Sequence, residues 1–119
     1  MIGKTSWVIP DGYMNDTKNG GFESHEAICV LNLSDKTAHI KITIYFEDRE
    51  PLKGFEAICE GNRTNHIRLD WIKNDKGETV PKGVPYAMFV ESDIPVVCQH
   101  SRMDVSQPEM TLMTTIPFA

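Results

Sequence analysis

TAHIKITIYF, residues 37–46, is the stretch of the sequence that decides the fold. In it, Ile40, Ile42 and Ile44 alternate with polar or charged side chains such as Lys41. A period of two over this many residues is typical of a β-strand with one buried face and one face toward water. We therefore expect a strand whose isoleucines point into the core.

Short apolar runs recur on both sides of this strand, roughly a dozen residues apart, as in all-β domains. They are TSWVI (5–9), AICVLNL (27–33), GFEAICE (54–60), TNHIRLDWI (64–72), YAMFVES (86–92), PVVCQHSRM (95–103) and TLMTTIPF (111–118). Turn-forming segments rich in Asp, Asn, Gly, Ser and Pro separate the runs, among them ESDIP at 91–95. About eight short strands at this spacing predict an all-β chain, an antiparallel β-sandwich or barrel.

Length and charge narrow the possibilities further. The 119 residues suit one domain, which we expect to span 1–119. A net charge of −5 makes nucleic acid an unlikely partner, because binding phosphates requires clustered Lys and Arg. The first residues lack the apolar segment of a secretory signal, and no apolar run is long enough to span a membrane. We therefore expect no membrane insertion and a cytoplasmic location.

One polar cluster lies in RTNHIRLD, residues 63–70. Ile67 and Leu69 share a parity and should face the core, which sends His66 and Arg68 to the opposite face. That face is either simply solvated or an anion-binding or polar-ligand surface, since guanidinium and imidazole groups recognise acceptor oxygens.

A second cluster lies in QHSRMD, residues 99–104. His100, Arg102 and Asp104 share one side of the expected strand, whereas Ser101 points to the other side. This alternation argues against a Ser101–His100 catalytic pair. The three side chains form either a structural ion pair at a strand end or one wall of a ligand site.

A third cluster, SHEA (24–27), places His25 and Glu26 where a long loop meets a strand. They are either ordinary polar residues at a strand start or a base with its partner. His25, His66 and His100 would meet around a zinc ion if their strands adjoined, as in a metal-dependent hydrolase. Nearby arginines would oppose a cation electrostatically, so we expect no metal ion. The sequence also shows no nucleophile elbow or other catalytic signature, and we expect no other cofactor and no enzyme.

The chain resembles the sensory rhodopsin transducer family, small soluble prokaryotic proteins named for the partner of a cyanobacterial sensory rhodopsin. The resemblance runs nearly end to end. It is carried by GKTSW (3–7), GY (12–13), SHEAICVLN (24–32), AHIKITIYFEDREP (38–51), RTNHIRL (63–69), IPVVCQHSRMD (94–104) and TLMTTIP (111–117).

The resemblance implies an eight-stranded, jelly-roll-like antiparallel β-sandwich that assembles as a homotetramer and acts in signalling rather than catalysis. Small-molecule sensing is the other role that it implies. The polar positions shared with the family are His25, Glu26, Arg63, His66, Arg68, His100, Arg102 and Asp104.

From these observations we expect a non-enzymatic, cytoplasmic transducer-type module that binds a small polar metabolite, sugar-like or anionic, with a signalling protein as a candidate partner. In this hypothesis the arginines hold acceptor oxygens, His66 and His100 exchange neutral hydrogen bonds, and Asp104 orients an arginine. The alternatives are the metal-dependent hydrolase and a protein- or DNA-interaction platform.

Overall fold

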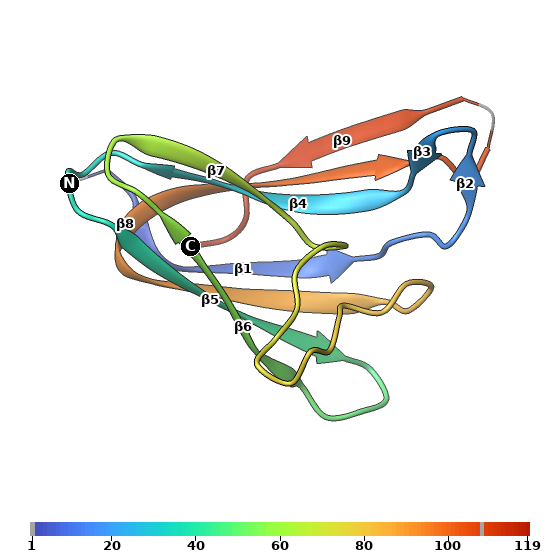
Figure 1. Cartoon of the computed structure of the whole chain (residues 1–119), viewed down its shortest axis with the longest axis horizontal. Coiled ribbons are helices and arrows are strands. Elements are labelled where there is room, and N and C mark those ends of the chain that lie inside the picture. The colour runs from blue at the N-terminus through green and yellow to red at the C-terminus, as the bar shows by residue number, and fades with distance from the viewer. Residues whose placement is uncertain (1, 108) are drawn as a thin grey trace.

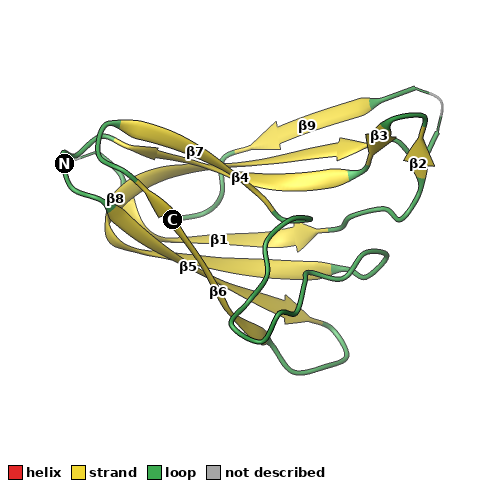
Figure 2. Cartoon of the chain, viewed as in Figure 1, coloured by secondary structure: helices red, strands yellow, loops and turns green. Residues whose placement is uncertain are grey.

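The computed structural model describes residues 2–107 and 109–119. Nine strands and no helix occur in this part of the chain (Figure 2). They are β1 (Lys4–Gly12), β2 (Lys18–Asn19), β3 (Phe22–Glu23), β4 (His25–Asn32), β5 (Ala38–Phe46), β6 (Leu52–Cys59), β7 (Arg63–Arg68), β8 (Tyr86–Asp104) and β9 (Thr111–Thr115). All pairings are antiparallel.

The long strand β8 belongs to two facing layers (Figure 1). Its first part pairs with β5 on one side and β1 on the other, and β6 extends that layer beyond β5. Its second part pairs with β4 and β9, and β7 extends the second layer beyond β4. The predicted all-β antiparallel sandwich is confirmed.

The turn predicted at 91–95 is wrong, because β8 continues through it. The turn-forming residues mark the place where the strand changes partners, from β5 at Ser92 to β4 at Val97. Pro95 lies in this interval, where its missing N–H does not interrupt a ladder with β4 or β5. The Asp93 carboxylate accepts a hydrogen bond from the His39 amide at 2.8 Å. These residues bend the strand without ending it.

The core lies between the two layers and follows the predicted period of two. Ile40, Ile42 and Ile44 are buried, while Lys41 on the other face of β5 is exposed. On β6, Phe55 lies opposite Ile42 and is the largest fully buried side chain among the described residues. The alternation expected for 37–46 is therefore confirmed.

The long connection between β1 and β4 is partly ordered by its own hydrogen bonds. In 10–24, β2 and β3 form a small hairpin around Gly20, whose φ of 61° suits a glycine. This hairpin lies at the end of the second layer where β4 begins (Figure 1). The described residues contain no helix that could span a membrane.

Candidate functional site

A buried carboxylate connects the two layers of the sandwich. Glu26, on the inner face of β4, is completely buried. Its Oε1 accepts hydrogen bonds from the Tyr86 hydroxyl at 2.6 Å and from His100 Nε2 at 2.9 Å. Its Oε2 accepts from the Tyr13 amide at 2.7 Å and from Arg102 Nε at 2.7 Å. We call these five residues the Glu26 network.

Strand register brings the network together. β4 and β8 run antiparallel with Glu26 opposite Arg102 and Ile28 opposite His100. Side chains directly opposite each other lie on the same face of a sheet, so all of them point inward. Tyr86 comes from the start of β8, in the other layer, and reaches across the core.

Hydrogen bonds determine the charge state of the network. Burial by itself would raise the pKa of Glu26, but the hydrogen bonds from His100, Tyr86, the Tyr13 amide and Arg102 outweigh it, so the pKa is lowered. Burial, together with the adjacent Glu26 carboxylate, raises the pKa of the Tyr86 hydroxyl. The network therefore holds an ionised carboxylate next to a neutral tyrosine.

All four donors of the network converge on one carboxylate that solvent does not reach. The Arg102 side chain is 21% exposed, and its Nη2 also donates to the Asp11 carbonyl at 3.3 Å. Such an arrangement orients the strands, and it leaves Glu26 no lone pair directed at an external ligand. Arg102 therefore forms a structural ion pair, and its partner is Glu26 on the neighbouring strand.

The Glu26 network should make the fold sensitive to acid. The folded-state pKa of Glu26 lies below its ordinary value of 4.5. The stabilisation that the ionised carboxylate gives the folded state is therefore present above pH 4.5 and is lost as the pH falls through the lowered pKa. We expect the free energy of unfolding, measured by urea titration at pH 7, 5, 4 and 3, to fall steeply below about pH 4.5. A Glu26→Gln variant should fall less steeply, and identical slopes for the two proteins would contradict the assignment.

The outer face of the second layer carries a different group of side chains. Arg68 on β7 forms a two-pronged ion pair with Asp70, with Nε to Oδ1 at 2.8 Å and Nη2 to Oδ2 at 2.7 Å. The Asp70 side chain is only 2% exposed. Burial would raise the pKa of Asp70, but the Arg68 hydrogen bonds dominate and lower it. A turn after β7 then places Trp71 against the Arg68 guanidinium, 4.0 Å from the ring centre.

A surface cleft of about 390 Å³ lies beside this pair, between the β2–β3 hairpin and the outer face of β4, β7 and β8. We call it the Trp71 cleft. Its lining residues are Gly21, Phe22, Glu23, His25, Arg68, Trp71 and Met103. His25 enters it from the first position of β4, where its Nδ1 lies 3.0 Å from the Glu23 carbonyl.

The eight residues of the sequence hypothesis are therefore distributed over several places. Glu26, His100 and Arg102 meet in the core, while His25 and Arg68 line the Trp71 cleft. The other three lie elsewhere. His66 is exposed opposite Cys29, Arg63 donates to the Asn62 carbonyl at 2.9 Å, and Asp104 Oδ1 accepts from the Ser106 amide at 2.8 Å.

The three histidines considered for a zinc site are not brought together. His100 points into the core, where it donates to Glu26, whereas His25 and His66 lie on the outer face of the same layer. Within residues 2–107 and 109–119, no three His, Cys, Asp or Glu side chains are grouped as metal ligands.

Sequence reasoning missed several residues of the two sites. Asp70 shares the parity of Arg68 two positions earlier, a pattern that is compatible with their ion pair. Phe22 and Glu23 lie in a loop-like segment with no recognisable pattern, and Tyr86 begins an apolar run like any core residue. The roles of these residues become visible only from the register of the strands and from the position of the β2–β3 hairpin.

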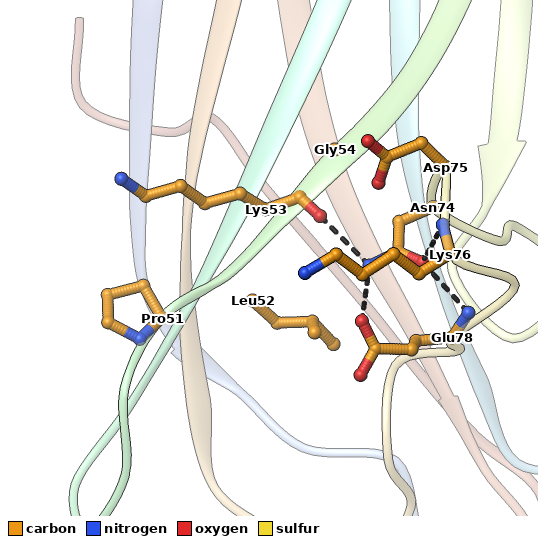
Figure 3. A pocket seen from close by; sticks show the side chains of 8 residues that line it. All are labelled: Pro51, Leu52, Lys53, Gly54, Asn74, Asp75, Lys76 and Glu78. Atoms are coloured by element: carbon orange, nitrogen blue, oxygen red, sulfur yellow. Dashed lines mark hydrogen bonds between the residues drawn. The ribbon is translucent and has the colours of Figure 1, made fainter.

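A second cleft, of about 430 Å³, lies between the start of β6 and the 74–78 loop (Figure 3). Asn74 organises this loop: its Nδ2 donates to the Lys53 carbonyl at 2.9 Å and to Glu78 Oε1 at 3.0 Å (Figure 3). Its Oδ1 accepts from the Glu78 amide at 2.8 Å. This cleft contains none of the eight residues, and its hydrogen bonds serve to fix the loop on β6.

Residues 2–119 match the family described as Anabaena sensory rhodopsin transducer. The chain belongs to this family. A solved structure from Thermotoga maritima is 42% identical to this transducer-family chain, with a TM-score of 0.89 over 99% of this chain and 96% of the other. The solved Anabaena sensory rhodopsin transducer is 36% identical, with a TM-score of 0.77 over 90% of this chain and 94% of the other. No curated protein matches the transducer-family chain.

Proposed function

We propose that this chain is a non-enzymatic, cytoplasmic signalling module that binds a small polar ligand in the Trp71 cleft and passes the bound state on to a protein partner. Its membership of the transducer family supports the signalling role. The observation that carries the ligand proposal is the cleft itself, where His25 and Arg68 lie beside an exposed tryptophan. Concave sites with an apolar wall and a few polar groups are where small ligands bind.

The positions of the titratable groups favour binding over catalysis. The buried Glu26 carboxylate already accepts four hydrogen bonds, so it is not poised to take a proton from a substrate. The histidines of the metal-dependent hydrolase alternative lie on opposite faces of one layer. The net charge of −5 disfavours the DNA-interaction alternative.

An exposed sheet edge supports assembly, which we propose is the homotetramer expected from the family. β9 pairs only with β8 among the described strands, and its five residues are all exposed. The stretch from Met110 to Phe118 contains no charged residue, and Leu112, Ile116 and Phe118 are each at least 66% exposed. An uncharged apolar edge of this kind is typical of a surface covered by another chain. Light scattering of the purified protein would test the stoichiometry.

Ligand binding should raise the thermal stability of the protein. We expect at least one compound in a screen of neutral sugars, nucleotides and organic acids to raise the melting temperature by several degrees. A hundred-fold excess over Kd stabilises the folded state by about 2.7 kcal/mol. Trp71→Ala should abolish the shift, because it removes the exposed wall of the cleft.

The matched controls lie on the same layer outside the cleft. His66→Ala and Arg63→Ala should leave the ligand-induced shift unchanged, since neither residue lines the cleft. If no compound at millimolar concentration stabilises the wild-type protein, the ligand-binding proposal is wrong.

A further inference from the structure

One surface cleft combines aromatic rings with negative charge. It has a volume of about 390 Å³ and lies where β1 and β5 end and β8 begins (Figure 1). We call it the Tyr45 cleft, and its lining residues are Pro10, Asp11, Tyr45, Phe46, Glu47, Pro85, Tyr86 and Ala87. It shares no lining residue with the Trp71 cleft, so it lies outside the site of the proposed function.

The sign of its charge distinguishes the Tyr45 cleft from the others. Among its lining residues, all of which the structure describes, Asp11 and Glu47 alone carry charge. Four other clefts on the described chain each include at least one lysine, arginine or histidine in their lining. A cleft whose charged groups all have one sign attracts ligands of the opposite sign. The Tyr45 cleft therefore favours a cation.

The two carboxylates of the cleft are open to a ligand. Within the described part of the chain, Glu47 forms no ion pair and no side-chain hydrogen bond. The Asp11 side chain is 85% exposed, and its Oδ1 lies 3.5 Å from Arg102 Nη2, which is long for a charged hydrogen bond. Neither carboxylate would have to leave a strong partner to meet an incoming cation.

The remaining lining is aromatic or otherwise apolar. Tyr45 is 42% exposed, whereas Tyr86 is 4% exposed and donates its hydroxyl to Glu26 at 2.6 Å. This hydrogen bond fixes the Tyr86 ring, so little rotamer freedom is left to be lost on binding. Phe46, opposite Tyr86 in the β5–β8 register, already attracts a cation of the chain itself. The guanidinium of Arg49, which is not a lining residue, lies 5.1 Å from the centre of the Phe46 ring.

Together these features point to one class of ligand. The faces of aromatic rings attract ammonium groups, and nearby carboxylates add to that attraction. We infer that the Tyr45 cleft binds a small organic ammonium ion, which packs against Tyr45 and places its charge near Glu47 and Asp11. The volume of about 390 Å³ lies in the lower part of the range for small-ligand sites and suits a free amine. The site goes beyond the proposed function, because the two clefts are separate.

Isothermal titration calorimetry with matched compounds tests the ligand class. The probes are choline and cadaverine. The controls are the neutral isostere of choline, 3,3-dimethylbutan-1-ol, and the anion glutarate, whose carbon chain is as long as that of cadaverine. We expect at least one of the two cations to bind at millimolar concentration or below, and its control to bind about ten-fold more weakly or less. The Kd of the cation should rise between about 50 and about 500 mM NaCl, because salt screens exposed charges.

Variants test the site. Tyr45→Ala should weaken the binding of that cation by at least about ten-fold, whereas Tyr45→Phe should retain it, because the ring face and not the hydroxyl attracts the cation. Glu47→Gln should weaken binding about two- to five-fold, the range for one exposed ion pair. The matched Glu50→Gln removes the same charge from an exposed position outside the lining and should leave the Kd unchanged. Melting temperatures of the free variants confirm that each is folded.

Amide chemical shifts of isotope-labelled protein, followed during a titration with the same cation, locate the site independently. We expect the largest changes at residues 10–11, 45–47 and 85–87, and only small changes at 21–25 beside the Trp71 cleft. The inference is overturned if neither cation binds at millimolar concentration, or if the matched control binds as tightly as its cation. Unchanged binding by Tyr45→Ala, or largest shifts outside the Tyr45 cleft, would also overturn it. The thermal-shift screen tests the Trp71 cleft separately, so either site can fail without the other.

Discussion

Replacing Glu26 by glutamine should lower the free energy of unfolding by about 3–5 kcal/mol, the range for breaking a buried ion pair on one side. The amide keeps the shape of the side chain but removes its charge and turns one acceptor into a donor. Arg102 then loses its buried counterion, and two donors among the Tyr13 amide, Tyr86, His100 and Arg102 face an NH₂ group. Equilibrium urea unfolding at pH 7 measures the loss.

Two further variants calibrate this result. Glu56→Gln makes the same chemical change at an exposed position of β6 and should change the stability by less than about 0.5 kcal/mol. Tyr86→Phe removes only one of the four donors and should cost about 1–2 kcal/mol. A loss below about 1 kcal/mol for Glu26→Gln would mean that the carboxylate does not hold the two layers together.

Replacing Phe55 by alanine should lower the free energy of unfolding by about 3–5 kcal/mol, as is usual for a buried phenylalanine. Phe55 is 1% exposed and lies between the layers opposite Ile42. Its removal leaves a cavity that the neighbouring isoleucines, fixed on β5, fill only in part. Thermal and urea unfolding both report the change.

The matched control is on the same strand. Ile58→Ala removes a large aliphatic side chain that is 51% exposed on the opposite face of β6, so it should cost less than about 1 kcal/mol. Comparable losses at the two positions would contradict the register between β5 and β6, because the register alone decides which residue is buried.

The fold was largely predictable because strand periodicity is a local signal. The alternation in 37–46 gave the buried isoleucines, and the apolar runs located β1, β4, β6, β7 and β9 to within a few residues. The failure at 91–95 has a physical cause. Pro95 and the polar Ser92 and Asp93 are equally typical of a turn and of a strand that changes partners, and only the pairing with β4 and β5 distinguishes the two.

The site was less predictable because it depends on contacts between distant segments. Parity correctly placed His100 on the same side as Val96 and Cys98, which are all buried. Parity does not identify the partner of Arg102, however. Asp104 was considered for that role, and the register instead brings Glu26, 76 residues away in the sequence, to Arg102 Nε. The Trp71 cleft likewise requires the β2–β3 hairpin to lie beside β4.

The shared strand β8 has a consequence for how the protein is made. In the part of the chain that the structure describes, the strands before residue 86 can pair only as β2–β3, β4–β7 and β5–β6, because β1, β4 and β5 otherwise depend on β8. While the polypeptide is being synthesised, no strand can therefore pair with both layers until residues 86–104 have left the ribosome. Folding is then dominated by long-range pairing and belongs to the slow, millisecond-to-second regime of all-β proteins. Until then the nascent chain leaves apolar strands without partners, and these are exposed to chaperones and to aggregation.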